Sequence, residues 1–404
     1  MTSSAPLDYL GRIETDLRRN VLPFWMEKAV NPADDTFFGS LTNDLVPDLT
    51  AERGCLLTTR ILWTYAAAYR QYRDPIYLTM ADRAYRDLIN HFYDAEYGGF
   101  YWSIAANGKV LRDRKQIYGQ AFAIYALSEY HAANGRREPL AQAIAVYGLI
   151  EKHGRENQHG GYLEAFGRDW QPIDDMRLSA VDQNEPKSQN THLHVLEAYT
   201  NLLRVWSDAG LHKTLSDLLE IMLTRIVDAR TGHLGLFFAK DWTVHSDKIS
   251  YGHDIEAAWL FTEATNVLRD AALTERTHAL AVKIADVTLA EGIDTDGGVY
   301  NEGSPSGLTN TNKEWWPQAE AVVGFLNAYQ ISGEKRFYEA AFHTWDFIEK
   351  RLIDSKRGEW LRGVTRDGQV LTNELKVGFW KCPYHNGRTG LESVRRIRAI
   401  TNHV

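Results

Sequence analysis

Nine consecutive residues near the end of the chain, Trp380–Arg388 (WKCPYHNGR), hold a cysteine, a histidine, two cations and two aromatics. Three chemistries would use such a set: a cysteine nucleophile, a metal site, or a histidine that transfers protons. The cysteine reading is the weakest. Pro383 follows Cys382, we expect no helix N-terminus there to lower the thiol pKa, and no known Cys-His signature surrounds it.

Two further histidines stand among apolar residues that are typical of buried helices. In NTHLHVLEAY, His194 shares a helix face with Asn190, four residues earlier, whereas His192 points to the opposite side and is expected to be a core residue. In SYGHDIEAAWL, His253 stands at a helix start with Glu256 on the same side, three residues later. Glu256 has a second interpretation, a first-turn carboxylate favoured by the helix dipole.

A metal site would need ligands at suitable spacing. Three histidines and a glutamate could form one, but the chain has no H-x-x-x-H or C-x-x-C spacing among them. Histidines acting as acid and base near neutral pH fit better. We therefore expect neither metal nor cofactor.

Composition narrows the class of protein. The chain has 404 residues, 44% apolar and 24% charged, and a net charge of −8, which argues against nucleic acid as a partner. No apolar run approaches the roughly 20 residues that span a bilayer, and the first 20 residues lack a signal-peptide core, so we expect a cytoplasmic protein with no membrane partner. The 12 Trp and 20 Tyr residues include candidates for stacking on sugar rings.

A short pattern of polar residues, glycine and aromatics recurs six times, as in DAEYGGFYW and DTDGGVYNEG. Its glycines are spaced by 60, 62, 74, 63 and 60 residues. A near-constant period predicts a repeat architecture. The aligned glycines are Gly39, Gly99, Gly161, Gly235, Gly298 and Gly358.

Each period holds two helical patterns. The first is Ala-rich and apolar on most sides, as over 118–133 and 319–330, and the second is amphipathic, as over 77–93 and 336–352. Six helix pairs predict an all-α fold, an (α/α)6 barrel of six helix-hairpin repeats, with residues 1–404 as one catalytic domain. The alternative is an open solenoid, which would need polar capping repeats that the terminal repeats do not resemble.

The polar residues that interrupt these apolar helical patterns stand at equivalent positions in successive repeats, at the start of each apolar helix. In a closed barrel this phase corresponds to one mouth, so these side chains are expected to converge on one pocket. They are Arg60, Tyr118, Asn190, His194, His253, Glu256, Trp315, Trp316, Glu320, Trp380 and His385.

The same segments resemble the N-acylglucosamine 2-epimerase family, most closely its cellobiose 2-epimerase branch. The resemblance spans TRILWTY, YGGFYW, KQIYGQAFAIYAL, NTHLHVLEAYTNL, SYGHDIEAAWL, KEWWPQAEAVVGFLNAYQ and WKCPYHNGR. It implies an (α/α)6 barrel that inverts C2 of a reducing-end sugar without metal or nucleotide.

The resemblance also implies roles for the candidates. His253 and His385 are the acid/base pair on opposite faces of the open-chain sugar, and His194 lies with Arg60 near O1, O2 and the enediolate. The expected substrate-binding residues are Arg60, Tyr118, Phe122, Asn190, Glu256, Trp315, Trp316, Glu320 and Trp380. We expect Arg388 to brace the loop that carries His385, and Cys382 to be a small packing residue.

Several alternatives stay open. Relatives with the same histidines epimerise mannose or isomerise it to fructose, and the segment 300–313 bears on this choice. A glycoside hydrolase would use Glu256 and Glu320 as its carboxyl pair, and a binding protein would have no catalysis. The expected partner is a small sugar, and the chain is expected to be a monomer or a homodimer.

Overall fold

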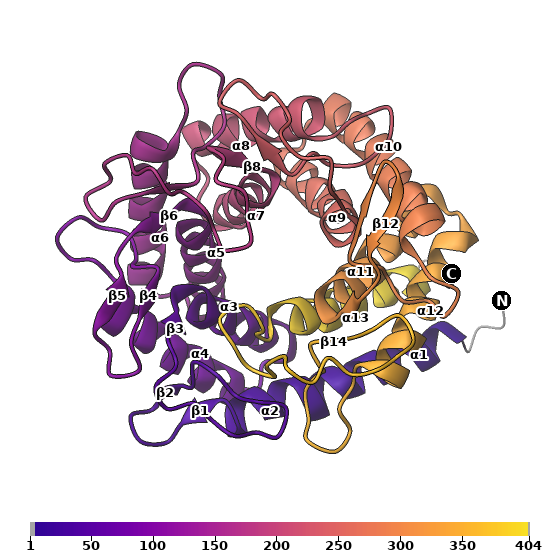
Figure 1. The fold of residues 1–404 in the computed structure, drawn as a ribbon, viewed down its shortest axis with the longest axis horizontal. Coiled ribbons are helices and arrows are strands. Elements are labelled where there is room, and N and C mark those ends of the chain that lie inside the picture. The colour runs from indigo at the N-terminus through magenta and orange to yellow at the C-terminus, as the bar shows by residue number, and fades with distance from the viewer. Residues whose placement is uncertain (1–4, 403–404) are drawn as a thin grey trace.

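The structure is a computed structural model that describes residues 5–402. Within this range six helices stand side by side in an inner ring, and the last contacts the first, which closes the ring (Figure 1). Most residues of each inner helix are buried, which the apolar sequences of α5, α9 and α11 predict and the polar sequence of α13 does not. The inner helices are α3 (Cys55–Tyr72), α5 (Ile117–Asn134), α7 (Gln189–Val205), α9 (Tyr251–Leu268), α11 (Trp315–Ser332) and α13 (Tyr384–Asn402).

An outer ring of amphipathic helices covers the inner one. Three of these helices, α4, α8 and α10, begin at an aspartate whose carboxylate caps the first turn: Asp74, Asp208 and Asp270. The outer helices are α1 (Ala5–Asp16), α2 (Leu22–Glu27), α4 (Pro75–Asp87), α6 (Arg137–Leu149), α8 (Ala209–Ile221), α10 (Ala271–Val287) and α12 (Lys335–Arg351). Single π-helical turns join α1 to α2 and end α4, α6, α8 and α10, over Leu17–Val21, Leu88–Phe92, Ile150–Gly154, Met222–Ile226 and Thr288–Gly292.

The pairing of the two rings is circular. Each inner helix from α3 to α11 packs against the outer helix that follows it, whereas α13 packs against α1, at the other end of the described chain. The predicted all-α (α/α)6 barrel is confirmed, and the open solenoid is wrong.

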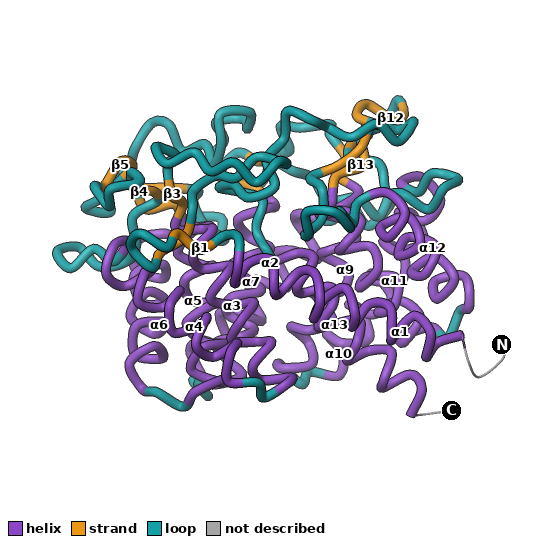
Figure 2. The backbone as a smooth tube through the Cα atoms, turned by 90° about the horizontal axis from the view of Figure 1, so that it is seen from below, coloured by secondary structure: helices purple, strands orange, loops and turns teal. Residues whose placement is uncertain are grey.

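Short antiparallel hairpins and long loops gather at one end of the barrel, while only short turns join helices at the other (Figure 2). In most repeats the strand just before an inner helix pairs with a strand beyond the next hairpin, as Lys115 does with Phe166. The strands are β1 (Val30–Asn31), β2 (Thr36–Phe37), β3 (Arg53–Gly54), β4 (Ser103–Ile104), β5 (Val110–Arg112), β6 (Lys115–Gln116), β7 (Ala165–Phe166), β8 (Lys187–Ser188), β9 (Phe237–Phe238), β10 (Ile249–Ser250), β11 (Glu302–Ser304), β12 (Gly307–Asn310), β13 (Lys313–Glu314) and β14 (Gly363–Val364).

The fourth residue of four inner helices ties the helix to its glycine hairpin. Gln120, His192, Asp254 and Gln318 each accept a hydrogen bond from a hairpin backbone N–H, at 2.9, 2.9, 2.9 and 2.6 Å. The interpretation of His192 as a core residue is therefore confirmed: it is fully buried and anchors a hairpin.

Two expectations about the last repeat are wrong. His385 does not lie in an irregular segment, because α13 begins at Tyr384. For the same reason a helix N-terminus does follow Cys382 closely, although this thiol is fully buried. Of the helices that the structure describes, none combines the length and apolar character needed to cross a bilayer.

Candidate active site

A cavity of about 170 Å³ lies at the hairpin end of the barrel, where the inner helices begin. Every inner helix supplies at least one lining side chain, so the predicted convergence is what the structure shows. The cavity is lined by Arg60, Tyr118, Asn190, His194, His253, Glu256, Glu314, Trp315, Trp316, Arg362, Trp380 and His385.

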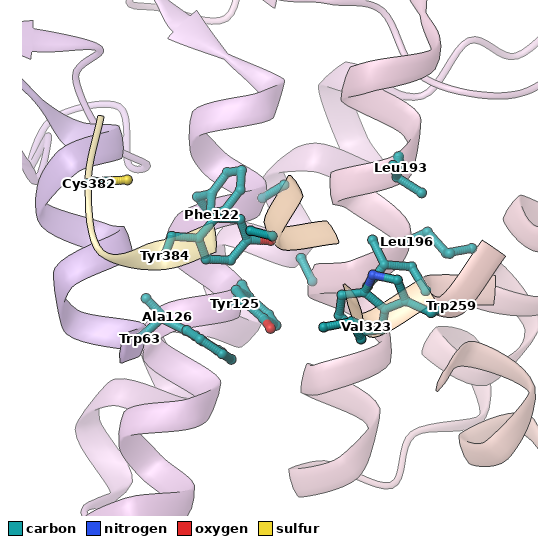
Figure 3. Close-up of a cluster of buried hydrophobic side chains, with 14 of the residues drawn as sticks. Trp63, Phe122, Tyr125, Ala126, Leu193, Leu196, Trp259, Val323, Cys382 and Tyr384 are labelled. Carbon is teal, nitrogen blue, oxygen red and sulfur yellow. The ribbon is translucent and has the colours of Figure 1, made fainter. Parts of the chain in front are cut away.

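Two of the predicted residues contact lining residues instead of the cavity. Phe122 packs against the Arg60 guanidinium at 4.3 Å and the His194 ring at 4.8 Å. Glu320 is fully buried behind His385. Figure 3 shows Phe122 and Tyr384 at the edge of the apolar cluster that packs among the inner helices.

His253 and His385 both lie beside the indole of Trp316. Their ring centroids are 4.6 and 5.7 Å from that of Trp316. The two imidazoles can be no farther apart than the sum of these distances, which is short enough to enclose a sugar carbon.

A carboxylate fixes the ring of His385. Nδ1 of His385 lies 2.7 Å from Oε1 of Glu320, and Trp259 donates to the other oxygen of this carboxylate at 3.0 Å. A carboxylate partner favours the proton on Nδ1 and leaves the lone pair on Nε2. The Ser250 hydroxyl lies 2.8 Å from Nδ1 of His253, so this ring is held by a hydrogen bond as well.

His194 has its own carboxylate, Glu197, one helical turn later. Nδ1 of His194 lies 2.9 Å from Oε2 of Glu197. Tyr384 donates to both oxygens of Glu197, at 2.6 and 2.7 Å. This carboxylate thus connects α7 to α13 beneath the cavity.

Arg388 is the central cation of the site. Its Nη2 donates to Glu256 at 2.5 Å and to Glu320 at 2.7 Å, and its Nη1 donates to Glu197. The expectation that Arg388 braces a loop is wrong, because it lies on α13 and neutralises three buried carboxylates.

The same carboxylates raise the question of a metal. One oxygen or nitrogen atom from each of Glu256, Glu320 and His385 lies within 4.8 Å of the others. However, Arg388 already donates to both carboxylates, and a guanidinium and a divalent cation would compete for the same oxygens. This donor set fits an ion-pair network better than a metal site.

Burial sets the protonation of the histidines. Burial lowers the pKa of His253 to about 3, and burial together with the cations Arg60 and Arg388 holds the pKa of His385 well below its usual range. Burial also lowers the pKa of His194. All three imidazoles are therefore neutral at neutral pH, the form that accepts a proton.

Two buried carboxylates of the site differ in their protonation state. Burial and the nearby Glu320 raise the pKa of Glu256 to about 8. For Glu197, burial alone would raise the pKa, but the Arg388 cation and the hydrogen bonds from His194 and Tyr384 prevail and lower it to about 2. Glu256 thus holds a proton at neutral pH while Glu197 stays ionised.

Several buried polar atoms of the cavity wall have no hydrogen-bond partner among residues 5–402. They include Oδ1 of Asn190, Oε2 of Glu256 and Nε of Arg60. The other end of Arg60 donates to the Tyr118 hydroxyl at 2.7 Å. Unpaired buried donors and acceptors are unfavourable unless a ligand satisfies them, and sugar hydroxyls would do so.

The sequence analysis missed Glu197 and Tyr384 as parts of the site and misassigned Arg388. Glu197 follows His194 by three residues, so the helical spacing that linked His253 to Glu256 applies to this pair as well. Tyr384 and Arg388 are four apart on α13, a signal that was lost with the expectation of an irregular segment.

Fold and site together define an (α/α)6 barrel with a cavity lined by histidines and tryptophans. The model of the N-acylglucosamine 2-epimerase (GlcNAc 2-epimerase) family matches residues 36–387. The cellobiose 2-epimerase of Bacteroides fragilis is 44% identical over 383 residues, which cover 94% of this chain and 97% of the relative. That of Dictyoglomus turgidum is 39% identical, covering 94% and 97%.

The structural comparison agrees. The structure of cellobiose 2-epimerase from Spirochaeta thermophila superposes with a TM-score of 0.91 at 39% identity, covering 99% of this chain and all of that one. The chain belongs to the N-acylglucosamine 2-epimerase family, and it is an isomerase, a sugar 2-epimerase.

Proposed function

We propose that this enzyme inverts C2 of the reducing-end aldose of a β-1,4-linked disaccharide such as cellobiose, with His253 and His385 as its acid/base pair. The observation that carries the proposal is the placement of these two neutral imidazoles beside the same indole, with Nδ1 of each ring held by a partner. The names of the similar relatives supply the substrate class.

The reaction begins when the ring opens and C1 becomes a carbonyl, which acidifies the C2 proton. One histidine removes this proton through Nε2, and the electron pair moves toward the C1 oxygen to form a cis-enediolate. The other histidine has meanwhile taken up one proton from solvent at Nε2. After rotation about C2–C3 it gives this proton to C2, the carbonyl re-forms, and the first histidine releases its proton to solvent, so that both rings return to the neutral form.

Preorganised donors stabilise the enediolate. The guanidinium of Arg60, fixed by the Tyr118 hydroxyl, and the ring of His194 are the groups proposed to face O1 and O2. Stabilising the developing charge is the largest single kind of catalytic help. Asn190 and Glu256 supply the unpaired oxygens for substrate hydroxyls, and Trp315, Trp316 and Trp380 supply ring faces.

A second, larger cavity favours a disaccharide over a monosaccharide as the substrate. A cavity of about 490 Å³ shares Asn190, His253, Glu314 and Trp316 with the first, and so continues it toward the solvent. Asn301 and Glu302, from the segment 300–313 noted in the sequence, line this larger cavity. It offers room for the second sugar ring.

The geometry does not favour a glycoside hydrolase. A hydrolase needs two carboxyl groups that flank the scissile bond. Glu256 and Glu320 instead accept hydrogen bonds from one Arg388 nitrogen, and Glu320 lies behind His385 instead of lining the cavity.

The test is incubation of the purified enzyme with cellobiose, lactose and mannose in D2O containing EDTA. We expect deuterium at C2 of the epimers of both disaccharides and slower turnover of mannose. Free glucose would indicate a hydrolase, fructose an isomerase, and no change a binding protein. Loss of activity in EDTA would indicate that the enzyme depends on a metal ion.

Replacement of either histidine tests the acid/base pair. We expect His253→Ala and His385→Ala each to lower kcat by about 100- to 10,000-fold, the usual contribution of a general acid or base. His192→Gln is the matched control, since His192 is a buried histidine that anchors a hairpin. Full activity in either alanine variant would contradict the mechanism.

A further inference from the structure

Glu359 has an unusual backbone conformation for its residue type. It stands in the sixth glycine hairpin, directly after Gly358, with φ of 63°, in the left-handed region that disfavours side chains with a Cβ. The corresponding hairpins have Gly99, with φ of 71°, and Gly161, with φ of 80°, at this place. A non-glycine residue held in this region usually serves a function that offsets the strain.

The Glu359 side chain is fully buried and collects three donors from separate parts of the chain. Lys381 donates to Oε2 at 2.5 Å, and Asn386 donates to Oε1 at 2.6 Å. Trp25 donates to the same Oε1 at 3.1 Å. Lys381 is itself fully buried, so this carboxylate is its compensating charge.

Two of these donors flank the segment that carries the catalytic histidine. Lys381 follows Trp380 directly, and Asn386 follows His385 directly. Lys381 also lies 5.4 Å from the Trp315 ring, whose centroid is 6.1 Å from that of His385. One carboxylate therefore holds both ends of the turn that brings Trp380 and His385 into the cavity.

We infer that Glu359 is a positioning residue of this active site, which sets the placement of His385 through Asn386. The inference rests on the proposed role of His385. The side chain itself does not line the cavity, so its effect on the reaction is indirect.

Two double variants separate positioning from simple stability. In E359G/K381M the glycine suits the backbone and no charge is left buried alone, but the link to Asn386 is gone. In E359Q/K381M the charges are also gone, but the amide oxygen still accepts from Asn386 and Trp25. The two proteins differ in the hydrogen bonds from Asn386 and Trp25 and in the buried volume of the side chain.

We expect E359Q/K381M to keep kcat within about 3-fold of the unmodified enzyme. We expect E359G/K381M to lose about 10- to 100-fold in kcat with little change in KM, the scale of an ångström-level misplacement. Equal kcat values in the two variants, at equal folded fractions, would overturn the inference.

A matched control and a structural readout complete the design. Glu151→Gln alters another carboxylate, which accepts from the hydroxyls of Tyr162 and Tyr199 away from the cavity, and should leave kcat unchanged. Crystal structures should show the His385–Glu320 contact kept in E359Q/K381M and lost in E359G/K381M. This readout decides the positioning role even if the unmodified enzyme proves inactive on every sugar, which would count against the proposed function alone.

Discussion

At the scale of single residues, the site depends on one guanidinium. Arg388 is the shared partner of Glu197, Glu256 and Glu320, and all four side chains are buried. A buried cation with several carboxylates is stable only as a complete set, because each removed partner leaves a desolvated charge. The electrostatic potential at the histidines of the site therefore depends on Arg388 and its three carboxylate partners.

Removing the cation should therefore destabilise the protein in a pH-dependent way. We expect Arg388→Met to lower the free energy of unfolding by about 3–5 kcal/mol at pH 7.5. Loss of Arg388 raises the folded-state pKa values of all three carboxylates, including those of Glu256 and Glu320, which are already above the usual value. Protonation then relieves the repulsion, so the deficit shrinks toward pH 5. Urea unfolding at the two pH values measures this. A deficit that does not change with pH would contradict the argument.

The imidazole of His253 should stay neutral well below the usual histidine range. Burial lowers its pKa to about 3, so its ring should not titrate between pH 7.5 and 5. Imidazole ¹⁵N NMR shifts of the unliganded enzyme measure this. A midpoint near 6.5 for His253 would mean that water reaches the ring in solution.

At the scale of the repeat, the fourth residue of the inner helix explains how each hairpin is held. Gln318 accepts from the N–H of Val299 and donates to the carbonyl of Glu314, four residues earlier. His192 makes the same pair of contacts, with Tyr162 and with the carbonyl of Ser188. Glutamine and histidine are thus equivalent here.

This equivalence predicts that His192→Gln is tolerated and becomes favourable in acid. Burial lowers the pKa of His192 to about 4, so the native residue loses stability as the pH falls from about 6.5 toward 4, when the unfolded chain takes up the proton. The variant should match the parent at pH 7.5 and exceed it by about 2 kcal/mol at pH 5. Denaturant unfolding at both values tests this, and a variant that is equally destabilised at both would refute the equivalence.

The sequence predicted most of the helices, because apolar periodicity is a local signal. It also predicted that polar residues at the starts of the inner helices meet in one pocket, because the glycine period places them at equivalent positions. It failed where the last inner helix begins. The first turns of α13 contain Asn386, Gly387 and Gly390, which weaken any helical pattern. The role of Arg388 follows from contacts with three other helices, which local patterns do not contain.

At the scale of the whole molecule, two glycines let α13 close the ring. A Cβ on Gly387 would lie 2.9 Å from Thr64 of α3, and a Cβ on Gly390 would lie 3.0 Å from Leu17 between α1 and α2. The last inner helix therefore fits between the first inner helix and the first outer segment only because these positions lack side chains.

A larger side chain at Gly390, where α13 packs against Leu17, should weaken the closure of the barrel. We expect Gly390→Ala to lower the free energy of unfolding by about 1–3 kcal/mol, despite the better helix propensity of alanine. Leu17→Ala in the same chain should recover part of the loss, which gives a favourable coupling in a double-mutant cycle measured by urea unfolding. Strictly additive effects would show that the two positions do not press on each other in solution.

The contribution of every inner helix to one cavity has a consequence for biosynthesis. A nascent chain that has emerged from the ribosome up to α11 already carries Glu197, Glu256 and Glu320, but neither Arg388 nor His385. Those residues arrive only with α13, which must then find partners nearly 400 positions earlier, as Glu14 and Arg398 do. Contacts between such distant residues form slowly, so the appearance of sugar turnover reports the final step of folding. A chain truncated before α13 should have no turnover.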